Sequence, residues 1–117
     1  MLDSQNSGLV SRVAERFRAM GDENRIRILS LLVEAPANVT ALTRDLKMNQ
    51  ASVSKHLGIL RQAGLVDFDR LGSQSIYRIV DPSVQNLCKL VCDGVLQHAR
   101  QQHEALHGPS SGEVKSA

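Results

Sequence analysis

The chain carries two groups of side chains whose types and spacing suit chemistry. The first is polar and lies within one short segment, where Gln50, Ser54 and Lys55 are accompanied by the small residues Ala51 and Gly58. Glutamine can form two hydrogen bonds with adenine, lysine can pair with guanine, and serine with either base. Small neighbours would let these side chains approach base edges closely, so this group suits the reading of DNA.

The second group consists of the two cysteines, Cys88 and Cys92, which stand four residues apart. On a helix this spacing places two soft sulfur ligands on one face, which suits a metalloid, an oxidant or a persulfide donor. A disulfide within the helix is disfavoured, because the Cβ atoms would be about 5–6 Å apart and a disulfide needs about 3.5–4.5 Å. Reduced cysteines that pack as small hydrophobic side chains are the alternative.

Other chemistry finds less support. His103 and His107 stand four apart and could form a weak metal site with Glu104, although a solvated helix end is the favoured explanation. The sequence has no glycine-rich phosphate loop, no H-E-x-x-H motif and no plausible pair of nucleophile and base. An enzyme is therefore not predicted.

The polar group lies on a segment with helical periodicity. Val53, Leu57 and Leu60 fall at i, i+4 and i+7, which predicts a helix with these side chains inside and the polar group outside. Asn49 is a good N-cap for this helix, and Gly64 tolerates the positive φ at which helices often end.

A shorter helix precedes this one. Thr40 is its predicted N-cap, and Leu42 and Leu46 share one face. The residues Lys47-Met48-Asn49 then break the pattern and form a turn. Two helices joined by such a turn form the helix-turn-helix, whose second helix lies in the major groove of DNA. An ordinary helical hairpin with a solvated face is the alternative.

A β-hairpin is predicted directly after the second helix. Residues 65–70 and 75–80 alternate apolar and polar side chains, and the segment between them, 71–74, contains a glycine. Such a hairpin is the wing of a winged helix-turn-helix, although it could also merely cover the core. Its tip would carry three polar side chains toward DNA: Arg70, Ser73 and Gln74.

Three outer helices complete the predicted fold. The first has an apolar stripe from Leu9 to Met20, and the second begins at a cap, Asp22. The core-facing side chains of the second are predicted to be Ile26, Leu29, Leu32 and Val33. The last helix begins with Asp81 as N-cap and Pro82 at the first helical position, and it reaches about Leu106. Its apolar face is long for so small a core, which favours packing against a second copy of the chain.

Three segments resemble one known family. The run FRAMGDENRIRIL, residues 17–29, resembles the L-x-D-x-x-R-x-x-I-L opening of the ArsR/SmtB repressors. NQASVSKHLGILRQAGLV, residues 49–66, and GSQSIYRIVDP, residues 72–82, resemble the family's recognition helix and its junction from wing to last helix. The likeness spans roughly residues 9–105.

The resemblance implies a dimeric bacterial repressor that a metal ion, metalloid or oxidant releases from its operator. It implies dimerisation through the first and last helices. By resemblance, the DNA contacts fall at Gln50, Ser52, Ser54, Lys55 and His56. The family's two familiar metal sites are not matched, because residues 38–42 contain no cysteine and the ligand positions after Asp81 hold Ser83, Gly94 and Gln97.

Length and charge agree with a small DNA-binding domain. The 117 residues suit one domain, predicted to span residues 7–107, with disorder in residues 1–6 and 108–117. The net charge is only +2, but residues 40–78 carry six basic side chains against three acidic ones. Arg61 and Arg70 are predicted phosphate contacts, whereas Asp67 and Asp69 stand where the family more often has basic or neutral residues.

The sequence thus predicts a mainly α, winged helix-turn-helix protein with four helices, a hairpin and a fifth helix. Its predicted function is that of a homodimeric repressor that binds double-stranded DNA at an inverted-repeat operator, with no required cofactor and with a thiol-directed effector as an option. No signal peptide or membrane span is predicted, so a cytoplasmic location with reduced thiols is expected. The alternatives are a protein-interaction module of the same fold and an ArsR-like regulator without a direct effector.

Overall fold

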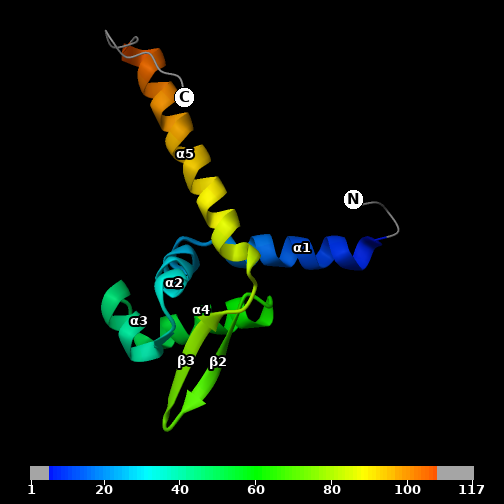
Figure 1. Cartoon of the computed structure of the whole chain (residues 1–117), viewed down its shortest axis with the longest axis vertical. Coiled ribbons are helices and arrows are strands. Elements are labelled where there is room, and N and C mark those ends of the chain that lie inside the picture. The colour runs from blue at the N-terminus through cyan, green and yellow to red at the C-terminus, as the bar shows by residue number, and fades with distance from the viewer. Residues whose placement is uncertain (1–5, 108–117) are drawn as a thin grey trace. The chain divides into compact units, whose positions relative to one another are not determined.

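The computed structural model of the chain describes residues 6–107, which divide between two compact units, Met1–Pro82 and Ser83–Ala117. Within the described residues, the first unit holds four helices and three strands, and the second holds one helix (Figure 1). The predicted disorder of residues 1–5 and 108–117 lies outside the described part of the chain. In chain order, the elements are α1 (Ser7–Met20), α2 (Glu23–Glu34), β1 (Ala37–Asn38), α3 (Val39–Leu46), α4 (Gln50–Gln62), β2 (Val66–Leu71), β3 (Gln74–Ile79) and α5 (Ser83–His107).

Asx side chains begin three of the helices. Asp22 accepts a hydrogen bond from the Arg25 backbone N–H at 3.1 Å, and Asn49 accepts one from Ser52 at 2.8 Å, so both predicted caps are confirmed. The predicted cap of α3 is wrong. Asn38 caps this helix by accepting from the Ala41 N–H at 2.7 Å, because the helix already begins at Val39.

Left-handed residues end the two central helices. Lys47 closes α3 at φ 56°, and the predicted turn separates it from α4. Gly64 follows the end of α4 at φ 81°, a conformation that glycine adopts without the steric cost of a Cβ atom. The helix-turn-helix expected from the spacing is therefore present.

The hairpin is tighter than predicted and belongs to a larger sheet. Leu71 pairs with Gln74, which leaves a two-residue loop in which Gly72 has φ 65°. β1, which the sequence did not predict, pairs antiparallel with β3 and gives the strand order β1-β3-β2. In Figure 1 the β2–β3 hairpin extends beyond the helices of its own unit, as a wing would.

Aliphatic side chains from four elements fill the core of the first unit. The deepest members are Ile28, Leu29, Leu42, Val53, Leu57, Leu60, Leu65 and Val66. One predicted core residue is wrong, because Ile26 is 49% exposed while Ile28 is completely buried. Residues that are two positions apart in the sequence lie about 200° apart around a helix. Ile26 and Ile28 therefore cannot share the face that Leu29 and Leu32 bury.

The second unit is a single helix, α5, which begins at Ser83, one residue after the predicted start at Pro82. Several of its large apolar side chains are 57–69% exposed: Leu90, Val91, Val95 and Leu96. Across residues 6–107, no helix is both long and apolar enough to cross a membrane.

Candidate nucleic-acid interface

Helix α4 has one face locked into the core and one face open to solvent. Val53 and Leu57 have no exposed surface, whereas Gln50, Ser54 and Lys55 are exposed. Ser52, another predicted contact, is half-buried near the cap of the helix. The three exposed side chains therefore form a polar row on a helix whose inner face fixes its orientation.

Gly58 lies in the middle of α4, where it is exposed. A methyl group added there would meet no other atom within 4 Å, so the fold of the single chain does not require glycine at this position. Glycine inside a helix costs about 0.5–1 kcal/mol relative to alanine. An unexplained cost on the outward side of α4 is consistent with a surface that another molecule approaches closely.

His56 lies apart from the polar row. Its ring is only 15% exposed, with Nδ1 3.2 Å from the guanidinium of Arg25 and 3.9 Å from the carboxylate of Asp22. The side chain thus faces α2 and is separate from Gln50, Ser54 and Lys55. The contact with DNA that the resemblance implied for His56 receives no support from this placement.

Arg25 connects three helices, a role that sequence reasoning missed. Its guanidinium donates to the carbonyl of Ala19 at 2.6 Å and to that of Arg18 at 3.4 Å, both at the end of α1, besides contacting His56. Its backbone N–H is the main reason that the pKa of the Asp22 carboxyl lies below its ordinary value. The D-x-x-R spacing of Asp22 and Arg25 was the sequence feature that could have indicated this role. Through these contacts, Arg25 of α2 connects the end of α1 with the inner side of α4.

Arg61, a predicted phosphate contact, is already paired within the chain. Its Nε donates to Asp67 at 2.8 Å, and its guanidinium lies 4.7 Å from the ring centroid of Phe68. The hydrogen bond from Arg61, with a second from the Phe68 N–H at 2.9 Å, holds the pKa of the Asp67 carboxyl below its ordinary value. Asp67 therefore keeps its charge beside the arginine.

A second arginine on the wing is paired in the same way. Arg78 Nε donates to Asp69 at 2.8 Å, and a second guanidinium nitrogen lies 3.5 Å from the other carboxylate oxygen. This pairing lowers the pKa of Asp69 and raises that of Arg78. The two carboxylates that the sequence marked as unusual are thus the partners of two arginines.

The tip of the wing carries the remaining predicted contacts. Ser73 is exposed in the loop, and exposed Arg70 donates to the hydroxyl of Ser75 at 3.3 Å. Gln74 accepts a hydrogen bond from the Asn38 side chain at 2.9 Å, which links the tip to the start of α3. The wing is thereby tied to the helix-turn-helix by a polar contact as well as by β1.

The two cysteines are both free, and they differ in exposure. Cys88 is half-buried, and burial raises the pKa of its thiol, whereas Cys92 is exposed. Among residues 6–107, no three His, Cys, Asp or Glu side chains come together in a way that could hold a metal ion. His103 lies on an exposed turn of α5, and the side chain of His107 lies outside the described part of the structure.

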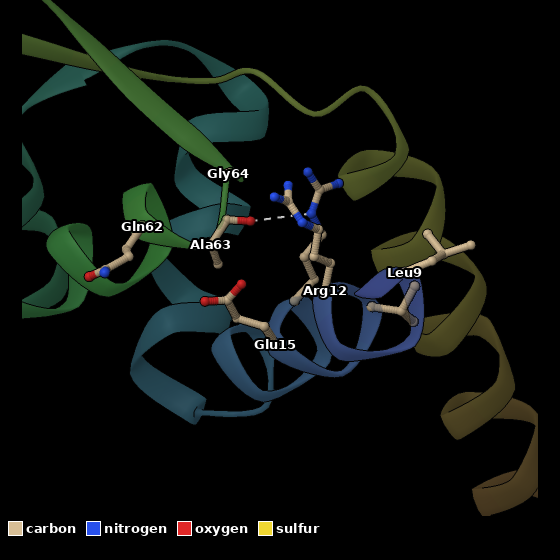
Figure 2. Close-up of a pocket in the computed structure, with 8 residues that line it drawn as sticks. Leu9, Arg12, Glu15, Gln62, Ala63 and Gly64 are labelled. Carbon is tan, nitrogen blue, oxygen red and sulfur yellow. Dashed lines mark hydrogen bonds between the residues drawn. The ribbon is translucent and has the colours of Figure 1, made fainter. Parts of the chain in front are cut away.

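A shallow pocket of about 320 Å³ lies between α1 and the end of α4 (Figure 2). Leu9, Arg12 and Glu15 reach it from α1, and the dashed line in the figure is the hydrogen bond of 3.2 Å from Arg16 to the carbonyl of Ala63. Arg16 also pairs with Asp81. The lining residues offer no nucleophile, so this pocket has no features of a catalytic site.

Comparison with known proteins identifies related regulators. The sequence model described as bacterial regulatory protein, arsR family, matches residues 22–67. An uncharacterised HTH-type transcriptional regulator of Methanocaldococcus jannaschii is 41% identical over 81 residues, which are 68% of this chain and 91% of that protein. The HTH-type transcriptional regulator NmtR of Mycobacterium tuberculosis is 34% identical over 113 residues, 95% of this chain and 88% of the relative.

Two further similarities concern a named repressor and a solved fold. The arsenical resistance operon repressor of Bacillus subtilis is 30% identical over 87 residues, 74% of this chain and 83% of the relative. The homodimeric winged helix-turn-helix DNA-binding domain of Mycobacterium bovis Mb0332 superposes with a TM-score of 0.78 at 29% identity. That superposition covers 86% of this chain and 93% of that domain.

Proposed function

The chain belongs to the ArsR family of bacterial DNA-binding transcriptional regulators, and we propose that it acts as a homodimeric repressor at an inverted-repeat operator in the cytoplasm. The protein is a transcription regulator and not an enzyme. One relative carries the name of an operon repressor, and a structural neighbour is a homodimeric DNA-binding domain.

The observation that carries the proposal is the two-sided character of α4. Its inner face is completely buried, so the helix cannot rotate, and its outer face presents Gln50, Ser54 and Lys55 to solvent. Side chains of these types can discriminate base edges in the major groove. A rigid helix with such a row is what direct readout requires, and a solvated face of an ordinary helical hairpin would not need it.

The exposed apolar side chains support the dimeric part of the proposal. Leu9, Val10 and Phe17 of α1 are exposed in the single chain, as are several large apolar side chains of α5. Burying one such side chain contributes about 1.5–3 kcal/mol, so a second copy would gain considerably from covering them. Two recognition helices related by a two-fold axis would then read half-sites about one helical turn apart, as an inverted repeat.

The test is operator binding by a variant of the polar row. Fluorescence anisotropy would measure the affinity of the protein for duplex fragments selected from genomic DNA and for random duplexes of equal length. Gln50→Ala should cost about 1–3 kcal/mol on the selected fragment and little on random DNA, because a base contact is lost. Gln85→Ala on α5 is the matched control and should change neither the affinity for the selected fragment nor that for random DNA. An equal loss on both duplexes with Gln50→Ala would show that α4 does not read bases.

The proposal extends to a thiol-directed effector at Cys88 and Cys92. Soft thiolates suit metalloids, and exposed Cys92 is the more accessible of the pair. Arsenite, an oxidant or a persulfide donor should release the wild-type protein from its operator and leave a Cys88→Ser/Cys92→Ser variant bound. Identical responses of the two proteins to all three reagents would instead favour a regulator without a direct effector at these cysteines.

A further inference from the structure

Two arginines near the proposed DNA surface are held by carboxylates of the wing. Arg61 lies eleven residues after Gln50 and seven after Ser54, which places it within about 20° of each around α4, on the outward face. Its partner is Asp67 on β2, and Arg78 on β3 is paired with Asp69 on β2. Both arginines are therefore engaged within the chain before any DNA arrives.

These pairs have little to do with holding the fold together. The side chains of Arg61 and Asp67 are 53% and 45% exposed, and those of Arg78 and Asp69 are 44% and 66% exposed. Exposed ion pairs contribute little to stability, because solvent screens them and two side chains lose freedom. Their carboxylates also carry the same sign of charge as DNA, which makes them costly on a DNA-binding surface.

We propose that Asp67 and Asp69 compete with DNA phosphates for Arg61 and Arg78, and that this competition weakens binding to the operator more than binding to random DNA. The inference rests on the proposed function. On the operator, base contacts by α4 fix the register, so phosphates reach the positions at which they can displace the carboxylates. On random DNA the register is not fixed, so the arginines stay with their aspartates and no ion pair has to be broken.

The geometry favours Asp67 as the stronger of the two competitors. Its Oδ1 accepts from both the Arg61 Nε and the Phe68 backbone N–H, so the carboxylate is held in place for the arginine. The guanidinium of Arg61 also lies against the ring of Phe68. Asp69 is bound only through Arg78 in the contacts described above, so we expect a smaller effect there.

The first experiment measures the affinity of the Asp67→Asn variant for a random duplex and for a selected operator fragment over a series of salt concentrations. Asparagine keeps the shape of the side chain and the oxygen that accepts the Phe68 N–H. Operator affinity should rise about threefold to fivefold, because an exposed ion pair no longer has to be broken. The salt slope on the operator should not change, since the phosphate contact already exists there. Affinity for random DNA should rise less than about twofold, since the wild-type pair stays intact there and costs that binding little.

A double-mutant cycle separates a freed arginine from a simple change in net charge. In an Arg61→Ala background, Asp67→Asn should raise operator affinity by less than about twofold, because no arginine remains to be released. Asp93→Asn, which removes a carboxylate paired with Lys89 on α5, is the control of equal charge and should produce no gain. A gain that persists without Arg61, or that Asp93→Asn reproduces, would overturn the inference.

The outcomes also distinguish failure of this inference from failure of the proposed function. A wild-type protein that binds the selected fragment more tightly than random DNA supports the proposed function, whatever Asp67→Asn does. If Asp67→Asn then leaves the ratio of the two affinities unchanged, the competition between carboxylate and phosphate is excluded. Thermal unfolding at the same salt concentrations should be nearly the same for wild type and variant, which confirms that folding does not cause the change.

Discussion

Helices α4 and α5 bury their apolar side chains to very different extents. α4 has Val53, Leu57 and Leu60 completely inside the core, and its exposed side is polar apart from small residues. α5 is nearly twice as long, and it leaves large apolar side chains such as Leu90 and Val95 exposed. The packing of α4 is thus explained by its own chain, whereas the exposed face of α5 is not.

The two helices therefore obtain their stability from different sources. The interior of the chain fixes the orientation of α4, so its outer residues are free to be chosen for a ligand. The apolar surface of α5 needs a partner, since a helix of this composition gains most of its stability from packing. Substitutions in the two helices should therefore have effects of different kinds.

The largest effect is expected for Leu57→Ala in α4. Truncating a completely buried leucine leaves a cavity and costs about 3–5 kcal/mol. Urea unfolding should show this loss at every protein concentration. Leu90→Ala in α5 provides the comparison, and its effect should grow on dilution if a second copy covers that side chain. A loss of stability in Leu90→Ala that does not depend on protein concentration would show that no second copy covers Leu90.

The next effect concerns Val95→Asp in α5. Valine is 63% exposed in the single chain, so the charge would cost little in a monomer, but at a covered interface it should weaken dimerisation by about 2–3 kcal/mol. Sedimentation velocity would measure the change. Gln97→Asp adds the same charge about 200° away around the helix and should leave the dimer intact. Equal dimerisation by both variants would argue against an interface at Val95.

A smaller effect with two opposite signs is expected for Gly58→Ala. The substitution should stabilise α4 by about 0.5–1 kcal/mol, because alanine favours a helix and the added methyl meets no atom within 4 Å. Operator binding should nevertheless weaken, since the methyl would lie between α4 and the bases. Gly8→Ala in α1 is equally unobstructed and should leave operator affinity unchanged. Tighter operator binding by Gly58→Ala would mean that α4 does not approach DNA closely.

The smallest effect is on acid stability and distinguishes the restraints on the two helices. The pKa of Asp22 lies below its ordinary value of 3.8, chiefly because of the Arg25 N–H, so its stabilising contribution is complete above that pH and is lost as the pH falls below it. Asp22→Asn, which keeps a capping oxygen, should reduce the loss of stability in acid. Asp93→Asn in α5, which removes a carboxylate paired with Lys89 one turn away, provides the comparison. Circular dichroism across this pH range would compare the two.

Local patterns in the sequence were sufficient for much of the fold. The spacing of Val53, Leu57 and Leu60 determined the buried side of α4, and Asn49 and Gly64 marked its limits. These features depend on hydrogen bonds and contacts within a few residues, which a short stretch of sequence contains. Local spacing did not identify the buried residue near the start of α2. Ile26 and Ile28 are both apolar, and only packing against other elements determines that Ile28 is buried and Ile26 is exposed.

Tertiary structure alone decided which charged groups meet. No periodicity relates Arg61 to Asp67, Arg78 to Asp69, or Arg25 to His56. Each pair joins separate elements or adjacent strands, so its existence depends on how those elements are placed and on the register of the hairpin. The sequence by itself thus determined the helices and the row of polar side chains on α4. The folded chain determined which arginines begin in ion pairs, because distances of a few ångströms between elements are set only when the core has packed.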